Sequence, residues 1–361
     1  MKSGAYSKIG KLKIWEIVKL TRTLPFSKIR AHSPTPKLVL IGSFGAGNVG
    51  DELILAGFLQ KIRKELPKAK VVVLAGNPKL VRRFHGVDAL PMLPTGLRSF
   101  WKMNWWRSLQ KIRTADAIIF PGGGLFSDEE SWQAVFLWGL HILVARYFWK
   151  PVYLLGQSVG PFEKKWTRKF TRFCLAKTEW IGVRDAASEA ELTRSGIPAR
   201  KIRSGRDTAL WLIARLPKMR EVKKRGVLKV LVSVRDFPKI EPRFWHELAR
   251  ALDLLTEKKH ARIFFAEFGA GDRTVWQKVR RRTKNSATWK TLALPESAEE
   301  ILRAVKKFDL VIGMRLHSLI AAQLTGVPAV GLNYSRKIGE FTDKALSIKN
   351  FKKEQLLKSL S

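Results

Sequence analysis

The segment Gly313-Met314-Arg315-Leu316-His317 combines residue types that can bind an anion and move a proton, and Tyr334-Ser335-Arg336-Lys337 follows further along the chain. An arginine can hold a phosphate or a carboxylate through two N–H groups, a lysine supplies a point charge, and a histidine transfers protons near neutral pH. These types suit a substrate that carries both a phosphate and a carboxylate. The structural alternative is that carboxylates at a helix start satisfy Arg315 and His317.

A strand and a helix must position these residues. The apolar run Leu310–Ile312 predicts a buried strand, and the residues from Ser318 onward predict a helix. Arg315, His317 and the nearby backbone N–H groups would then face whatever binds at the end of the strand.

Similar apolar runs, ending in glycine or in a charged pair, recur along the chain. Further strands are predicted at Leu38–Ile41, Val71–Leu74, Ala117–Phe120, Val152–Leu155, Trp180–Val183, Val230–Val234, Ile263–Ala266, Thr291–Leu294 and Ala329–Leu332. In the second half, helices fit between them at Phe244–Thr256, Arg273–Thr283 and Ala298–Lys306. This alternation predicts an α/β protein whose ligands bind at the carboxyl ends of parallel strands.

The order of these elements predicts two Rossmann-like, doubly wound domains that face one cleft, over residues 37–215 and 227–345. The charged segment Leu216–Gly226 would link them. Residues 1–36 are expected to form a basic arm. Residues 346–361 are expected to form a last helix that could cross back to the first domain.

Composition narrows the class of protein. The chain has 361 residues, 45% of them hydrophobic, which suits a globular protein of two domains. The single cysteine, Cys174, excludes an internal disulfide and a cysteine-built metal cluster, and it fits a reducing compartment. No secretory signal is apparent, and the longest apolar run, Ala134–Ala145, is too short to span a bilayer.

The net charge of +38 predicts a polyanionic partner: nucleic acid, an anionic membrane face, or an acidic or phosphorylated substrate. Simple solubility is the alternative. Two segments suit a membrane surface: the basic arm, which could form an amphipathic helix, and Arg98–Arg113, in which Trp101, Trp105 and Trp106 alternate with cations. Packing on the protein itself is the alternative for both.

Two glycine-rich strand ends could approach a ligand closely. In the first, Gly45-Ala46-Gly47-Asn48-Val49-Gly50 has the letters of a dinucleotide loop, but no acidic residue closes the next strand, which argues against a nicotinamide cofactor. A phosphate or carboxylate still suits such a loop, and Asp51 follows it at a helix start. In the second, Gly122-Gly123-Gly124 precedes Asp128, and a tight turn is the alternative to a ligand site.

The segment Trp166–Asp185 has a helical pattern with separate basic and aromatic faces. Its cations could hold a diphosphate, although a solvated face is the usual explanation for such a stripe. The basic face consists of Lys165, Arg168, Lys169 and Arg172, and the aromatic face of Trp166, Phe170 and Phe173.

Taken together, these motifs resemble the polysaccharide pyruvyltransferase family, in particular the enzymes that act on cell-wall polymers. The matching pieces are Gly42–Asp51, Gly122–Gly124 with Asp128 and Ser131, Gln157–Pro161, Val183–Asp185, Gly313–Ser318 and Tyr334–Lys337. The family usually has Asp-Pro where this chain has Ser335-Arg336, which leaves the choice of acceptor open.

The resemblance implies a fold like that of GT-B glycosyltransferases and transfer of a pyruvyl group from phosphoenolpyruvate to a sugar, as a ketal. It further implies a glycan acceptor on a lipid diphosphate and an enzyme at the cytoplasmic face of the plasma membrane. No metal-ligand cluster is visible in the sequence, and we expect no cofactor besides the co-substrate phosphoenolpyruvate.

On this interpretation Arg315 and Lys337 hold the donor and His317 transfers the proton. The residues expected to contact substrate are Gly45, Asn48, Asp51, Gly123, Gly124, Asp128, Arg184 and Tyr334. Two alternatives remain: a glycosyltransferase that uses a nucleotide sugar, and a non-catalytic protein that binds polyanions. Binding to nucleic acid is not expected, because no zinc-finger or RNA-binding signature is present. The oligomeric state and the sugar modified are open.

Overall fold

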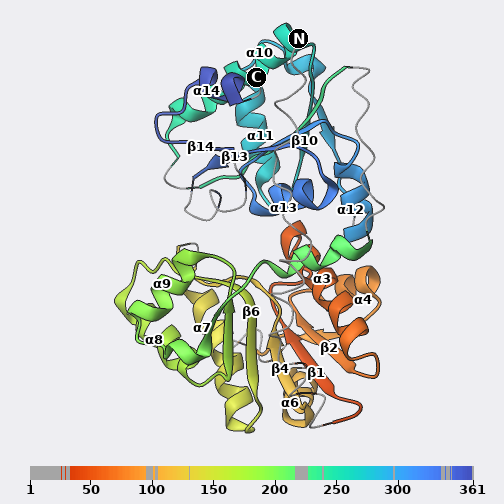
Figure 1. Cartoon of the computed structure of the whole chain (residues 1–361), viewed down its shortest axis with the longest axis vertical. Coiled ribbons are helices and arrows are strands. Elements are labelled where there is room, and N and C mark those ends of the chain that lie inside the picture. Colours follow the sequence, from red (N-terminus) through yellow and green to blue (C-terminus); the bar gives the residue numbers. More distant parts are fainter. Residues whose placement is uncertain are drawn as a thin grey trace. The chain divides into compact units, whose positions relative to one another are not determined.

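The computed structural model of the chain (Figure 1) describes residues 26, 29, 33–94, 101, 105–129, 131–215, 227–237, 240–295, 297–334, 338, 342 and 344–359. Most of the predicted basic arm, the predicted linker Leu216–Gly226 and Lys337 lie outside these residues. The chain divides into two compact units. One holds the described residues of 13–47 and 51–212, and the other holds 48–50 and the described residues of 213–361.

The first unit is built on a parallel sheet. Its strands are β1 (Lys37–Ile41), β2 (Lys70–Ala75), β3 (Asp88–Pro91), β4 (Ala117–Phe120), β5 (Gly123–Phe126), β6 (Val152–Val159), β7 (Trp180–Val183) and β8 (Ile202–Ser204). They lie in the order β3-β2-β1-β4-β6-β7-β8, with β5 paired to β6. The central strands β4 and β6 are buried along their whole length. Burial on both faces explains the continuous apolar sequence of β4 and of the first part of β6, Val152–Leu155.

Helices of this unit connect the parallel strands. They are α3 (Val49–Glu65), α4 (Pro78–His85), α6 (Trp105–Thr114), α7 (Trp132–Tyr147), α8 (Lys165–Ala176) and α9 (Ala186–Arg194), with short 3-10 turns at Ala199–Lys201 and Thr208–Arg215. The face of the sheet toward α7 buries a core in which Phe120, Phe126, Trp138 and Ile142 pack together.

A second parallel sheet forms the other unit. It contains β9 (Lys229–Ser233), β10 (Arg262–Ala266), β11 (Lys290–Leu292), β12 (Leu310–Gly313), β13 (Ala329–Asn333) and β14 (Ala345–Ser347), in the order β11-β10-β9-β12-β13-β14. Its helices are α10 (Pro242–Lys259), α11 (Asp272–Arg280), α12 (Ala298–Val305), α13 (Leu316–Thr325) and α14 (Lys353–Ser359), and a 3-10 turn spans Ser286–Thr288.

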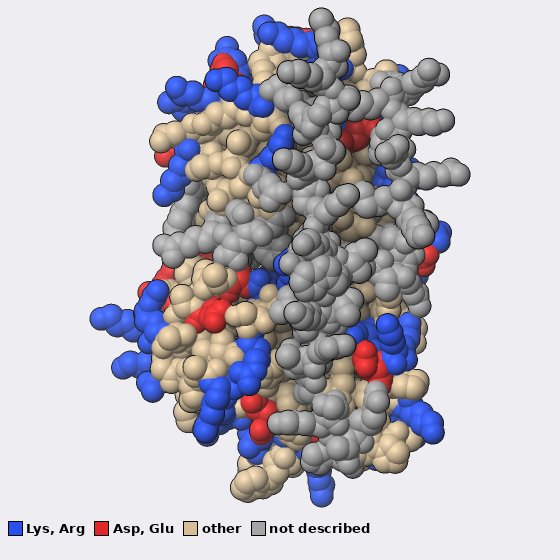
Figure 2. All heavy atoms as spheres, in the orientation of Figure 1, with Lys and Arg blue, Asp and Glu red and all other residues tan. Residues whose placement is uncertain are grey.

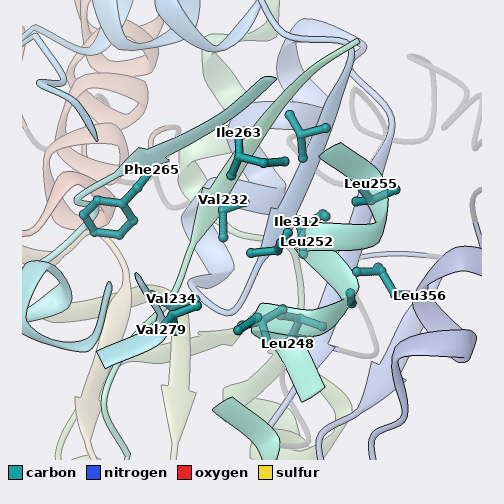
Figure 3. Close-up of a cluster of buried hydrophobic side chains, with 14 of the residues drawn as sticks. Val232, Val234, Leu248, Leu252, Leu255, Ile263, Phe265, Val279, Ile312 and Leu356 are labelled. Carbon is teal, nitrogen blue, oxygen red and sulfur yellow. The ribbon is translucent and has the colours of Figure 1, made fainter. Parts of the chain in front are cut away.

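The core of the second unit lies between its sheet and helices α10, α11 and α14. Val232, Ile263 and Ile312 project from three neighbouring strands toward Leu248 and Leu252 of α10 (Figure 3). At one side of this core, Trp276 stacks between Phe265 and Trp289 at ring distances of 5.0 and 5.2 Å.

Each sheet has a topological switch point, where the chain turns from one direction along the sheet to the other. In the first sheet it lies between β1 and β4, and in the second between β9 and β12. The loops that leave such a pair of strands diverge, and ligands of open α/β sheets bind in the space between them. The first switch point therefore has the two glycine-rich loops after β1 and β4, and the second has Arg315 after β12.

The α/β fold and the expected strands are confirmed, whereas two details of the prediction were wrong. The helix predicted over Trp166–Asp185 ends at Ala176, and its last part is strand β7. The C-terminal helix α14 does not cross to the first unit: Leu356 is buried in the core beside α10. Strands β3, β5, β8 and β14 were not predicted, because none of them contains a run of three or more apolar residues.

Within the described part of the chain, we find no helix that combines the length and the hydropathy needed to cross a bilayer.

Candidate functional site

The turn from β12 to α13 holds Arg315 and His317. Arg315 occupies the N-cap of α13, and its carbonyl accepts hydrogen bonds from the N–H and the hydroxyl of Ser318 at 3.0 and 2.6 Å. The N–H of Met314 donates to the carbonyl of Ser233, the last residue of β9, at 2.8 Å. The turn is thereby tied to the neighbouring strand. Half-buried His317 stands in the first turn of the helix, which begins at Leu316, two residues before the predicted start at Ser318.

Arg315 is paired with Asp272, the first residue of α11. Its Nε lies 3.1 Å from both carboxylate oxygens, and its Nη2 lies 2.6 Å from Oδ1. Asp272 is fully buried, whereas the Arg315 side chain keeps 17% of its surface exposed. Among the described residues Nη1 has no hydrogen-bond partner. The guanidinium is thus fixed along one edge and can still donate to an anion from the other.

The loop before α11 completes the environment of this ion pair. The N–H groups of Phe268 and Gly269 donate to Oδ2 of Asp272 at 3.2 and 3.0 Å. A Cβ on Gly269 would come within 2.6 Å of Arg315 Nη2, so a glycine here lets the guanidinium lie on the backbone. Burial raises the pKa of Asp272 above its ordinary value, although the bonds from Arg315 and these N–H groups oppose the rise.

Tyr334 lies at the end of β13 and contacts the end of β9. Its hydroxyl accepts a hydrogen bond from Nη1 of Arg235 at 3.0 Å, and its ring packs 5.0 Å from that of Phe237. Arg235, Arg315 and Tyr334 therefore follow β9, β12 and β13, which are adjacent strands of one parallel sheet. Two guanidinium groups and a phenol at the carboxyl ends of these strands can bind a small anion and orient a hydroxyl group.

At the switch point of the first sheet, Glu52 organises the loop after β1. One of its oxygens accepts a hydrogen bond from the N–H of Gly45 at 2.7 Å, and the other lies 2.7 Å from Nε2 of His85. Gly45 has a φ of +73°, and a Cβ there would come within 2.6 Å of the Asn77 carbonyl oxygen. Only glycine fits this conformation and this contact, which explains its position in the predicted phosphate loop.

Asp51 and Gly123 come together, although they are far apart in sequence. Asp51 Oδ1 lies 3.7 Å from the position that a Cβ on Gly123 would occupy. The carboxylate is largely buried, at the start of α3. Gly124 is exposed and follows Gly123 on β5. The predicted residues Gly45, Asp51, Gly123 and Gly124 thus lie in the two loops of this switch point or at the start of the elements that follow them. The Asn48 side chain accepts a hydrogen bond from the N–H of Gly50 at 3.1 Å, which holds the turn before α3.

Asp128 and Arg184 are each held by bonds to other residues of the first unit. The Asp128 carboxylate accepts bonds from the N–H groups of Glu163 and Lys164 at 2.7 and 2.9 Å and from the Thr167 hydroxyl at 2.5 Å. Burial by itself would raise the pKa of Asp128, but these bonds outweigh it and lower the pKa. Asp128 thus fixes the start of α8.

Arg184 belongs to a buried polar network behind β7. Its guanidinium pairs with Asp207 and donates from Nε to the Ser158 hydroxyl at 2.8 Å. Ser158 donates to Asp185 at 2.5 Å, and Asp185 caps α9 through the N–H of Ser188. The residue is 9% exposed, so its interactions with the protein account for its conformation.

The fold and the sheet-edge residues define a class: two-unit α/β proteins of the GT-B type, with ligand sites at the carboxyl ends of parallel strands. Solved structures of this class are similar to the chain over 90% of its length. The UDP-GlcNAc 2-epimerase of Neisseria meningitidis, bound to UDP-GlcNAc, matches with a TM-score of 0.59, 12% identity and 90% of its own chain covered. The lipopolysaccharide outer core galactosyltransferase WaaB matches with a TM-score of 0.54, 11% identity and 89% covered.

The sequence places the chain more narrowly. A profile of the polysaccharide pyruvyl transferase family matches residues 48–336, and the chain belongs to that family. It is also 22% identical over 356 residues to the amylovoran biosynthesis protein AmsJ of Erwinia amylovora, an alignment that covers 83% of this chain and 84% of AmsJ. The expected family is thus confirmed, and so is the expected class of enzyme, a transferase that acts on polysaccharide.

Three residues that shape these sites were not predicted to do so from the sequence. They are Asp272, which orients Arg315; Arg235, which contacts Tyr334; and Glu52, which contacts His85. A signal for Asp272 was present, because Gly269-Ala270-Gly271-Asp272 repeats the glycine-then-aspartate pattern of Gly45–Asp51. Glu52 was visible as a residue of the first helical turn, but its partner His85 could not be read from the sequence.

Proposed function

We propose that the chain transfers a pyruvyl group from phosphoenolpyruvate to two hydroxyl groups of one sugar, forms a ketal and releases phosphate. The observation that carries the proposal is the geometry of Arg315. Asp272 fixes Nε and Nη2 of its guanidinium at the switch point of the second sheet, and Nη1 points away from that pair. A pre-oriented arginine of this kind suits the carboxylate or the phosphate of a small enol phosphate.

In the proposed reaction, Arg315 and Lys337 hold the charges of the donor, and His317 donates a proton to its methylene carbon. The carbon that carries the phosphate becomes electrophilic, and a sugar hydroxyl attacks it and loses its proton. The C–O bond to phosphate then breaks, and a second hydroxyl closes the ketal with loss of its proton. Donor and diol thereby give the pyruvyl ketal and inorganic phosphate, with atoms and charge balanced.

The two loops at the switch point of the first sheet and the residues beside them are proposed to bind the acceptor. The switch point lies between β1 and β4. Gly45, Asn48, Asp51, Gly123 and Gly124 lie in or beside its two loops, where backbone N–H groups suit a diphosphate and the Asp51 carboxylate suits sugar hydroxyls. We propose that the acceptor is a glycan on a lipid diphosphate, at the cytoplasmic face of the plasma membrane. Asp128, Arg184 and Tyr334 remain candidates for substrate contacts in addition to their bonds within the protein.

The test is incubation of the purified protein with phosphoenolpyruvate and a lipid-linked glycan, followed by mass spectrometry. The glycan should gain the mass of pyruvate less one water, with one phosphate released for each ketal. Parallel incubations with nucleotide sugars address the second candidate function, glycosyl transfer, which the similarity to WaaB favours. Glycosylation without ketal formation would contradict the proposal.

A further inference from the structure

Helices α7 and α8 carry aromatic side chains that their own unit leaves exposed. Trp132 and Phe136 of α7 are both 41% exposed, and Trp166 and Phe173 of α8 are 44% and 53% exposed. Spacings of four and seven residues place them along one side of each helix. The rings of Trp132 and Trp166 meet edge to face at 5.5 Å, so the two helices present one continuous surface, here called the α7–α8 face.

Close packing between the two helices supports the α7–α8 face. Phe170, between Trp166 and Phe173, stacks on Phe136 at 5.7 Å, and a Cβ on Gly139 would come within 2.4 Å of its ring. The two helices therefore approach closely at Gly139. At the other end of the face, Asp128 fixes the start of α8 through three hydrogen bonds. The exposed rings therefore project from two closely packed helices.

Cations surround these rings. The segment Lys164–Lys177 contains six Lys or Arg residues and no acidic residue. The Nζ of Lys164 lies 5.8 Å from the ring centre of Trp132, and the Nζ of Lys177 lies 4.5 Å from that of Phe173. Figure 2 shows Lys and Arg side chains over the part of the surface where Figure 1 places α8 and α9. Rings with an apolar body beside cations are the composition of a membrane interface.

We propose that the α7–α8 face docks on an anionic lipid bilayer, with its aromatic rings at headgroup level and the cations of α8 against the anionic headgroups. A second copy of the chain is a poorer occupant, because a two-fold interface would bring these cations against the same cations of the partner. The proposal extends the proposed function, since a lipid-linked acceptor lies in such a bilayer. The experiments that test bilayer docking contain neither phosphoenolpyruvate nor a glycan acceptor, so docking and pyruvyl transfer can fail separately.

The first experiment measures co-sedimentation with vesicles of phosphatidylcholine, alone or mixed with phosphatidylglycerol. The test variant carries two substitutions on α8, Lys165→Glu and Lys169→Glu. The control variant carries Lys258→Glu and Lys259→Glu, which make the same change in charge on exposed lysines at the end of α10. Each cation near an anionic surface contributes about 1 kcal/mol, so the first pair should weaken binding about tenfold or more, and the second pair far less. Equal losses for both pairs would overturn the proposal, as would equal binding to both kinds of vesicle.

The second experiment isolates the aromatic rings. The double variant Trp132→Ser with Trp166→Ser should remove most of the binding that persists at high salt, whereas Trp106→Ser should leave it intact. Trp106 is an exposed tryptophan of α6 in the other segment that suits a membrane surface, so loss of this binding in Trp106→Ser alone would contradict the proposal. Retention of salt-resistant binding by the double variant would contradict the proposal. Concentration-dependent self-association of the wild type, abolished by the same double variant, would instead assign the α7–α8 face to a second copy.

Discussion

Arg315 and Asp272 form a two-point ion pair at the carboxyl ends of the strands of the second sheet, with Nη2 and Oδ1 2.6 Å apart. The two residues are separated by 43 positions in the sequence. The pair fixes Nε and Nη2 of Arg315, and Nη1 is directed away from the Asp272 carboxylate. The structural and the functional interpretation of Arg315 are therefore compatible: a structural carboxylate orients the residue that is proposed to hold the donor.

Replacing Arg315 with alanine should mainly raise the KM for phosphoenolpyruvate, because the residue is proposed to bind the donor in both the ground state and the transition state. Steady-state kinetics of phosphate release measure this effect. Arg303→Ala serves as a control, because Arg303 forms an exposed ion pair with Glu299 on α12. An unchanged KM would remove Arg315 from the donor site.

Asp272→Asn should also raise the KM for phosphoenolpyruvate, because the Arg315 guanidinium loses its fixed edge. Since breaking a buried ion pair leaves the remaining charge uncompensated, we expect the free energy of unfolding to fall by about 3 kcal/mol in urea titrations. The variant with both Asp272→Asn and Arg315→Ala should lose less stability than the sum of the single variants. Simple additivity would show that the two side chains are not coupled.

His317→Ala should lower turnover about a hundredfold or more, with little change in stability, because a general acid typically contributes a factor of about 10²–10⁴. Phosphate release from phosphoenolpyruvate measures the rate, and urea unfolding checks the fold. The matched control is His246→Ala, which removes an exposed imidazole from α10. Turnover equal to that of the control would show that another group transfers the proton.

Asp128→Asn distinguishes a structural from an acceptor-binding role of this carboxylate. Three hydrogen bonds to the start of α8 depend on it, so we expect a loss of about 2 kcal/mol in the free energy of unfolding, and about 1 kcal/mol for Thr167→Val. The pKa of Asp128 is lowered in the folded protein. The stabilisation that the Asp128 carboxylate contributes is therefore present above the ordinary pKa of an aspartate. It is lost as the pH falls through the lower pKa that Asp128 has in the folded protein. Normal stability with a raised KM for the glycan would instead assign Asp128 to the acceptor site.

His141 should make the first unit less stable in acid. Complete burial lowers its pKa from 6.5 to about 4, although its bond to the Leu137 carbonyl favours the charged form. Between these values the unfolded chain binds the extra proton, so the free energy of unfolding should fall by about 3 kcal/mol as the pH drops from 6.5 to 4. Urea titrations across this range should show a shallower pH dependence for His141→Gln than for the wild type. Parallel curves would contradict the assignment.

Much of the fold could be predicted from the sequence because most strands are buried on both faces and therefore read as continuous apolar runs. Leu310–Ile312 is one such run, and the chemistry-bearing residues that follow it lie where the pattern placed them. The short strands β3 and β8 could not be predicted, because three or four residues, some of them exposed, carry too little periodicity.

The sequence by itself determined the residue types at the strand ends, Arg315 and His317 after β12 and the glycines after β1 and β4, and it determined the excess of cations. Only the tertiary structure decided which of these charges are already engaged. Arg315 meets Asp272, Glu52 meets His85, and Arg184 meets Asp207 because parallel strands and their crossovers bring distant segments to the same edge of a sheet. The spacing of residues along the chain predicts neither these ion pairs and hydrogen bonds nor the burial of the side chains that form them.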